Sequence, residues 1–215
     1  MDFPVKYSTD RTRLYDIIDT EYKSDSFIAL FQSMSAEVFR IPFDTSNVTN
    51  MTNMLSSCGS LKCISSFDTS NATNMRYMFN NCRSLIAIPW FDTSKVSNMS
   101  NMFSGCSALR SIPQLDTSKV TNISLAGYNT LSSLVDLGGF VNLGAQNNLS
   151  GTSGSYFLGQ CPNLTHDSIM NVINNLYDRK TAGYSVLTLK LHANTMALLS
   201  DEEKAIATNK GWTLS

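Results

Sequence analysis

Residue types that could bind metal or form disulfides recur in this chain at one fixed spacing. Three cysteines and four aspartates each stand 24 residues apart. They are Cys58, Cys82 and Cys106, and Asp44, Asp68, Asp92 and Asp116. Thiols in such a series could pair as disulfides or bind zinc, and carboxylates could bind calcium. We call each set of equivalent positions in successive copies a column.

The cysteine column predicts buried free thiols. Equivalent positions outside the regular copies hold Met34 and Leu131, so the column accepts apolar side chains and faces inward. Zinc would need histidine or carboxylate ligands beside the thiols, and the interval from Cys58 to Cys63 contains no such spacing. We therefore expect no metal at the cysteines.

The aspartate column predicts a turn at each corner, in which a carboxylate accepts from a backbone amide nearby. A calcium-binding edge is the alternative, and the sequence leaves it open. A further column holds asparagines, which we expect to satisfy backbone groups of adjacent copies. Its members are Asn50, Asn74, Asn98 and Asn122.

Catalytic motifs are absent from the sequence. The histidines are His166 and His192, and neither lies in a nucleophile or metal motif. Residues 151–155 contain two glycines but lack the lysine of a phosphate-binding loop. We expect no enzyme activity and no cofactor.

Composition excludes further classes of function. Charged residues make up 15% of the 215 residues, the net charge is −1, and the pI is about 6.1. Without a basic surplus, nucleic-acid binding is not expected. No apolar run is long enough to span a membrane, and the first residues show no signal peptide. An apolar content of 42% predicts a packed core.

The spacing of 24 residues comes from an internal repeat, which predicts a solenoid of roughly five coils. The tetrad at Phe43–Ser46 returns at Phe67–Ser70 and Phe91–Ser94, and Leu115–Ser118 is a fourth copy. Within a copy we expect a short helix over Val96–Phe103 and a short strand over Leu109–Leu115. After Asp116 the interval lengthens to 25 residues, and residues 144–155 are expected to form a loop.

The repeat motif D-T-S-x-V-S/T-N-M-x-N-M-F-x-x-C-x-x-L resembles the BspA-like leucine-rich-repeat surface proteins of bacteria. The resemblance covers residues 24 to 121 most strongly and extends to the C-terminal segment. It implies an α/β fold, a right-handed leucine-rich-repeat solenoid with a ladder of short parallel strands. It also implies surface antigens, adhesins or phage-tail proteins rather than enzymes, located at the cell surface, outside the cell or on a virion.

A solenoid needs a cap over the apolar core at each end. We expect an N-terminal cap over residues 1–23, with a helix at Asp10–Asp19, and an α/β cap over 165–215. Between them, residues 24–164 form the solenoid, regular to about residue 121. In the C-terminal cap, Thr165 is expected to N-cap a helix, Val186–Leu191 to form a strand, and Ser200 with Glu203 to form a capping box. Gly211 is expected to end that helix before a last strand at Trp212–Leu214.

The positions that vary between copies indicate a binding surface. The candidate residues are Lys62, Arg76, Tyr77, Arg83, Trp90, Arg110 and Gln114. An exposed tryptophan beside arginines is a typical interface anchor, although Trp90 could instead cover a junction between coils or pack on a cap. We expect a recognition module that binds protein or glycan. The alternative is a structural subunit of a phage tail or similar assembly, and a homo-oligomer is possible in either case.

Overall fold

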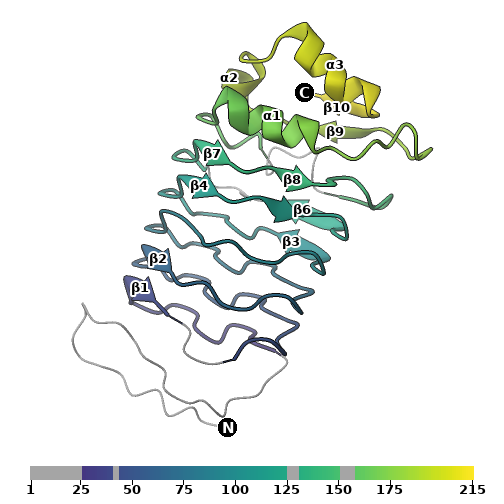
Figure 1. Ribbon diagram of the computed structural model, residues 1–215. Helices are drawn as coiled ribbons and strands as arrows, with labels where there is room; N and C mark the ends of the chain where they lie inside the picture. The colour runs from purple at the N-terminus through teal and green to yellow at the C-terminus, as the bar shows by residue number, and fades with distance from the viewer. Residues whose placement is uncertain (1–25, 41–43, 125–130, 151–157) are drawn as a thin grey trace.

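The computed structural model describes residues 26–40, 44–124, 131–150 and 158–215. The chain winds as a stack of turns, with a helix-containing module at its C-terminal end (Figure 1). In the described residues, no helix has the length and apolar character needed to cross a membrane. The expected N-terminal cap, including the helix at Asp10–Asp19, lies outside these residues, as does the 151–155 part of the expected loop. The domain boundaries stay a prediction.

The strands are two or three residues long and pair in parallel as five separate two-stranded sheets. The pairs are β1 (Val38–Phe39) with β2 (Cys63–Ile64), β3 (Asn98–Ser100) with β6 (Asn122–Ser124), β4 (Ser111–Ile112) with β7 (Asp136–Leu137), β5 (Leu115–Asp116) with β8 (Phe140–Val141), and β9 (Leu187–Leu189) with β10 (Trp212–Leu214). The helices are α1 (His166–Asn174), α2 (Ala193–Met196) and α3 (Asp201–Asn209).

The prediction of a leucine-rich-repeat solenoid is wrong. It required a strand ladder and a short helix in each repeat, whereas the sheets are small and separate. Among the described residues, helices begin only at His166. The expected helix over Val96–Phe103 is absent, and Asn98–Ser100 is instead strand β3.

Left-handed backbone conformations explain why the repeats do not form helices. Two columns, four residues apart, have positive φ in successive turns. The first holds Ala29, Asn53, Tyr77 and Asn101, and the second holds Ser33, Ser57, Asn81 and Gly105. One left-handed residue breaks a right-handed helix, and two within five residues leave no room for one.

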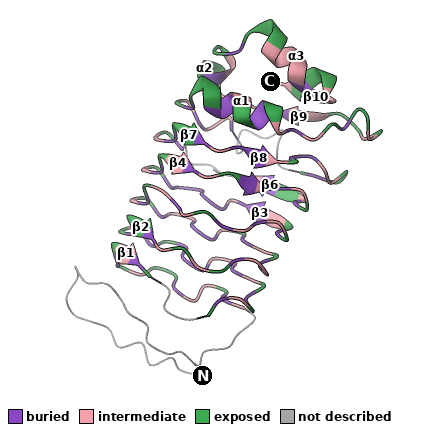
Figure 2. Ribbon diagram, in the orientation of Figure 1, coloured by how far each residue is buried: buried purple, intermediate pink, exposed green. Residues whose placement is uncertain are grey.

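Backbone hydrogen bonds join each turn to the next at the repeat spacing. Asn50 bridges to Asn74, and Asn74 to Asn98, in parallel. The expected slip to 25 residues is confirmed, because Ile112 pairs with Leu137 and Leu115 pairs with Phe140. About every third side chain turns inward, so each turn alternates between buried and exposed residues along its length (Figure 2).

A column of buried threonines adds a side-chain bond between turns. The Thr45 hydroxyl donates to the carbonyl oxygen of Asp68 at 2.7 Å, and Thr69 donates likewise to Asp92 at 2.9 Å. Thr93 and Thr117 repeat the contact at 2.9 and 2.8 Å. Each threonine is at most 3% exposed, so these bonds are shielded from water.

The elements expected in the C-terminal module are confirmed. Thr165 N-caps α1 by accepting from the amide of Ser168, and Ser200 with Glu203 forms the capping box of α3. Trp212 begins β10, and its buried indole donates to the carbonyl oxygen of Tyr177 at 3.1 Å.

The fully buried Arg179 ties this module to the end of the stack. Its guanidinium donates to the carbonyl oxygens of Gly144 at 2.6 Å, Gln146 at 3.2 Å and Ser185 at 2.8 Å, and to Oδ1 of Asn147 at 3.3 Å. All these acceptors are uncharged. The buried cation is therefore stabilised by carbonyl dipoles.

Candidate functional site

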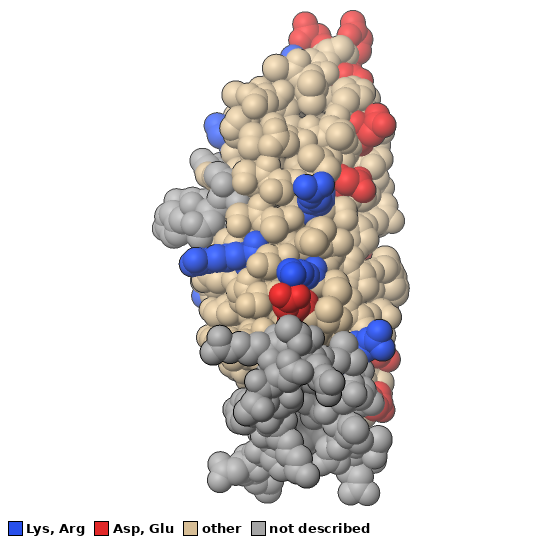
Figure 3. Space-filling model, turned by 90° about the vertical axis from the view of Figure 1, so that its left-hand side faces the viewer, with Lys and Arg blue, Asp and Glu red and all other residues tan. Residues whose placement is uncertain are grey.

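Two of the candidate binding residues, Lys62 and Arg110, stack with Ile86 between them. The amide of Ile86 donates to the carbonyl oxygen of Lys62 at 3.1 Å, and the amide of Arg110 donates to that of Ile86 at 2.8 Å. Lys62 also forms an ion pair with Glu37, 2.9 Å from Nζ to Oε2. Figure 3 shows the β1–β2–β4 side of the stack, where a few lysine and arginine side chains gather among mostly uncharged residues.

Trp90 lies on the same turn as Ile86 and points into solvent. Its side chain is 65% exposed, while the neighbouring Phe91 is 1% exposed and belongs to the core. Equivalent positions one turn away hold Ser66 and Gln114, both exposed. Most of the Trp90 surface is therefore open to solvent.

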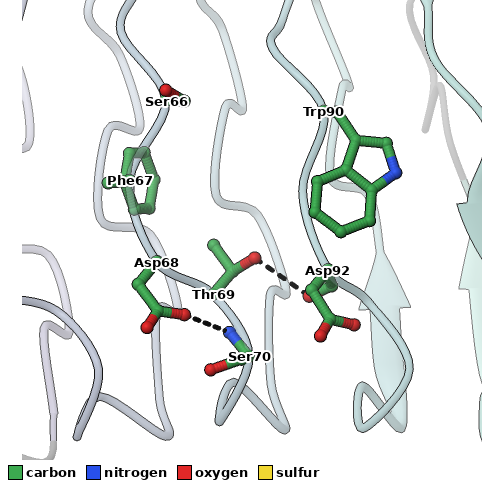
Figure 4. Close-up of a pocket in the computed structure, with 7 residues that line it drawn as sticks. All are labelled: Ser66, Phe67, Asp68, Thr69, Ser70, Trp90 and Asp92. Carbon is green, nitrogen blue, oxygen red and sulfur yellow. Dashed lines mark hydrogen bonds between the residues drawn. The ribbon is translucent and has the colours of Figure 1, made fainter.

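A pocket of about 430 Å³ lies against Trp90. Residues 66–70 of one turn line it together with Trp90 and Asp92 of the next (Figure 4). The lining combines the indole, the ring of Phe67, hydroxyl groups and two carboxylates. Small ligands or single side chains of a partner are bound by such mixtures of apolar walls and a few polar groups.

The aspartate column forms the expected corner turns. One carboxylate oxygen of Asp68 accepts from the amide of Ser70 at 2.8 Å, and Asp92 accepts from Ser94 at 3.0 Å. Asp44 and Asp116 make the same contact with the amide two residues on, at 2.9 and 2.8 Å. The hydrogen bond from Ser94 lowers the pKa of the Asp92 carboxyl. Both pocket carboxylates are thus held in place by backbone.

The side chains of the asparagine column were predicted to bond with adjacent copies, but the hydrogen bonds of Asn74 and Asn98 lie within their own turns. Oδ1 of Asn74 accepts from the amide of Arg76, and Oδ1 of Asn98 accepts from that of Ser100, each at 3.0 Å and within one turn. Contact between turns in this column comes from the backbone bridges. The side-chain oxygens therefore stabilise the local bend.

Two of the candidates lie away from the row formed by Lys62, Ile86 and Arg110. Arg76 and Tyr77 follow the column that contains Asn74 and β3, on the opposite side of the stack from β2 and β4 (Figure 1). The Arg76 guanidinium lies over the Tyr77 ring, 4.7 Å from its centroid. Arg83 is exposed at the bend before Ile86. The predicted site residues therefore form at least two separate surfaces.

The cysteines form no disulfides, and the repeat thiols are buried as expected. Sγ of Cys82 donates to the carbonyl oxygen of Leu55 at 3.0 Å, and Cys106 donates to that of Phe79 at 3.0 Å. Burial raises the pKa of the Cys106 thiol to about 12. Such thiols stay protonated at neutral pH and are poor nucleophiles and metal ligands.

Both histidines contribute to the ends of helices. Nε2 of His166 lies 2.8 Å from Oε1 of Glu203, which joins α1 to α3, and Nδ1 of His192 accepts from the amide of Asn194 at the start of α2. Across the described ranges, no three side chains of metal-binding type come together.

Sequence reasoning treated Trp90 and the aspartates separately and missed that they share a pocket. The signal was available, because Asp92 follows Trp90 by two residues and Asp68 is its copy one repeat earlier. Turns stacked about 4.8 Å apart bring such residues together.

Comparison with known proteins gives one match. The model of a family described as "Mycoplasma protein of unknown function, DUF285" matches residues 25–136. No curated protein and no solved structure matches the chain.

Proposed function

This chain belongs to the family of Mycoplasma proteins of unknown function, and on that premise we propose that it is a non-enzymatic recognition module. It binds a protein or a glycan at a bacterial or virion surface. The family description names no activity, so the proposal rests on the surface of the molecule.

The exposure of Trp90 is the observation that carries the proposal. The repeat does not need tryptophan there, because the equivalent turns hold serine and glutamine. Among the large apolar side chains that the structure describes, Trp90 is the most exposed, at 65%. Tryptophan and arginine dominate the binding energy of protein interfaces, and Arg110 stacks on Ile86 of the same turn.

The surface location is supported by the repeat motif, which resembles that of the BspA-like surface proteins of bacteria. A stack of turns suits recognition, because it presents side chains from successive turns at fixed distances on a continuous face. Lys62, Ile86 and Arg110 form one such row.

Binding arrays test this proposal. The labelled chain is applied to one array of extracellular-matrix and serum proteins and to one array of glycans, alongside Trp90→Ala. We expect a signal that falls at least tenfold in the variant, with an unchanged melting temperature. Leu198→Ala is the matched control, since Leu198 is 48% exposed in the C-terminal module, and it should bind like the wild type. No signal on either array, or equal binding by Trp90→Ala, would refute the proposal.

Molar mass in solution tests the structural-subunit alternative. Light scattering behind a sizing column should give a monomer near 23.7 kDa, with Trp90 accessible to acrylamide quenching. A defined oligomer that shields Trp90 would instead support a subunit of a larger assembly.

A further inference from the structure

Charge distinguishes the pocket beside Trp90 from the rest of its face. Among the described residues of the lining, Asp68 and Asp92 carry charge and none is a lysine or an arginine. Among the described residues, no hydrogen bond occupies the second carboxylate oxygen of Asp68. The pocket thus presents negative charge beside an exposed indole.

The same corner carries further negative charge along the stack. Asp44 and Asp116 stand one turn below and above the pocket, at about 4.8 Å per turn. The position three residues after each aspartate is lysine in the last two of these four turns, Lys95 and Lys119, but asparagine in the first two. Among the described residues of this corner, the carboxylates of Asp68, Asp92 and Asp116 are accompanied by the ammonium groups of Lys95 and Lys119.

Among the described residues, Lys95 is a cation whose charge acts on the pocket. The pKa of Asp92 is lowered chiefly by the hydrogen bond from the Ser94 amide and to a smaller extent by the charge of Lys95. Its ammonium donates to Oδ1 of Asn71 at 2.5 Å, on the turn that holds Asp68, and Lys95 is not among the described residues that line the pocket. Two carboxylates and one ammonium, those of Asp68, Asp92 and Lys95, leave a net negative charge among the described residues here.

We propose that this pocket binds the cationic side chain of a protein partner, an arginine or a lysine, between the indole of Trp90 and the carboxylates of Asp68 and Asp92. The inference rests on the proposed function and specifies its ligand. Cations are attracted to the face of an indole, and carboxylates add ion pairs with hydrogen bonds. The negative charge of the corner would not increase the affinity for an uncharged sugar.

Tryptophan fluorescence gives a direct measurement of this site. The chain has two tryptophans, and Trp212 is 1% exposed while Trp90 is 65% exposed. A ligand-dependent change in emission therefore reports Trp90. The probes are acetylated tri-arginine amide, its uncharged analogue tri-citrulline amide, and maltotriose, all at constant ionic strength.

We expect a saturable change with tri-arginine and none with the two uncharged probes. Asp68→Asn with Asp92→Asn should weaken tri-arginine binding at least tenfold. Asparagine keeps the oxygen that accepts from Ser70 and Ser94, so the turns should persist, and the melting temperature checks this. The matched control, Asp136→Asn with Asp201→Asn, removes the same charge elsewhere and should bind like the wild type.

The wild-type chain alone provides a second measurement. Its affinity for tri-arginine should fall steadily as sodium chloride rises, because salt screens exposed charges. Equal binding of tri-citrulline, a response to maltotriose alone, or no effect of salt would overturn the inference.

The arrays separate this inference from the proposed function. If Trp90→Ala loses array binding and the double aspartate variant retains it, recognition through Trp90 stands and the cationic ligand is wrong. If both variants bind like the wild type, both proposals fail. Parallel losses in both variants support both.

Discussion

The stack of turns and the C-terminal module are stabilised in different ways. In the stack, the same contact recurs in turn after turn, as in the threonine hydroxyls that donate to the next turn's carbonyl oxygens. In the module, single charged side chains make contacts that occur once. Arg179 reaches the end of the stack, and Lys210 donates to the carbonyl oxygens of Ile173 and Asn174 at the end of α1.

The difference shows where function can be sought. In the stack, a residue whose type differs from those at equivalent positions in other turns is not required by the fold. The presence of tryptophan at position 90 is therefore better explained by binding than by folding. In the module no copies exist for comparison, and an unusual residue such as Arg179 is explained by its own contacts. The following experiments test this contrast.

Arg179→Met should have the largest effect. It leaves the buried carbonyl oxygen of Gly144 without its donor and removes the bond to the Ser185 carbonyl, so the free energy of unfolding should fall by about 2 to 4 kcal/mol. Thr117→Val removes one repeated contact in the stack and should cost about 1 kcal/mol. Urea unfolding measures both. Equal losses in the two variants would show that the module does not depend on single contacts more than the stack does.

Two glycines with positive φ provide a smaller test. Gly211 follows α3, and a Cβ there would lie 2.9 Å from the backbone nitrogen of Lys180, which cannot easily move. Gly105 lies in a column that elsewhere holds serine and asparagine, and its added Cβ would mainly meet the side chain of Asn81. Gly211→Ala should lower stability by about 2 kcal/mol and Gly105→Ala by about 1 kcal/mol. Thermal unfolding that reverses this order would contradict the contrast.

The smallest effect is expected at His166. Its hydrogen bond to Glu203, with a smaller contribution from Asp167, raises the pKa of the imidazole. The folded pKa then exceeds the unfolded value near 6.5, so this stabilisation is complete below pH 6.5 and is lost as pH rises through the folded pKa. The pKa of Glu203 is lowered, chiefly by the Ser200 amide and then by His166, so its contribution disappears only in acid.

His166→Gln should therefore flatten the stability profile between about pH 6 and 8. The wild type should lose a little stability over that range and the variant none. Chemical unfolding at several pH values measures this. A variant whose profile matches the wild type would show that α1 and α3 are joined without this pair.

Much of the fold followed from residue spacing. The inward columns, the 25-residue slip at Leu137 and the caps at Thr165 and Ser200 were all predicted, because periodicity and capping residues are local signals. The helix predicted in each repeat was wrong, because left-handed conformations at Tyr77 and Ala29 leave no mark in the residue type. Asn53 and Asn101 did carry that signal, since asparagine tolerates positive φ.

The candidate site was predicted only in part. Trp90 was identified because it breaks its column. The pocket escaped prediction because its members belong to different columns and become neighbours only when the turns are stacked. Whether Asp68 binds a partner or only stabilises a turn is not encoded in the residue type.

The shared spacing of the turns has a consequence for how such a gene can change. Tandem copies recombine with one another, and an in-phase exchange adds or deletes one complete turn. The backbone donors and acceptors of an added turn can form hydrogen bonds with the neighbouring turns, because Asn50, Asn74 and Asn98 already bridge in one register. Trp90 occurs in a single turn and would move with it. Recombination can therefore change how far the tryptophan projects from the C-terminal module without any new folding information.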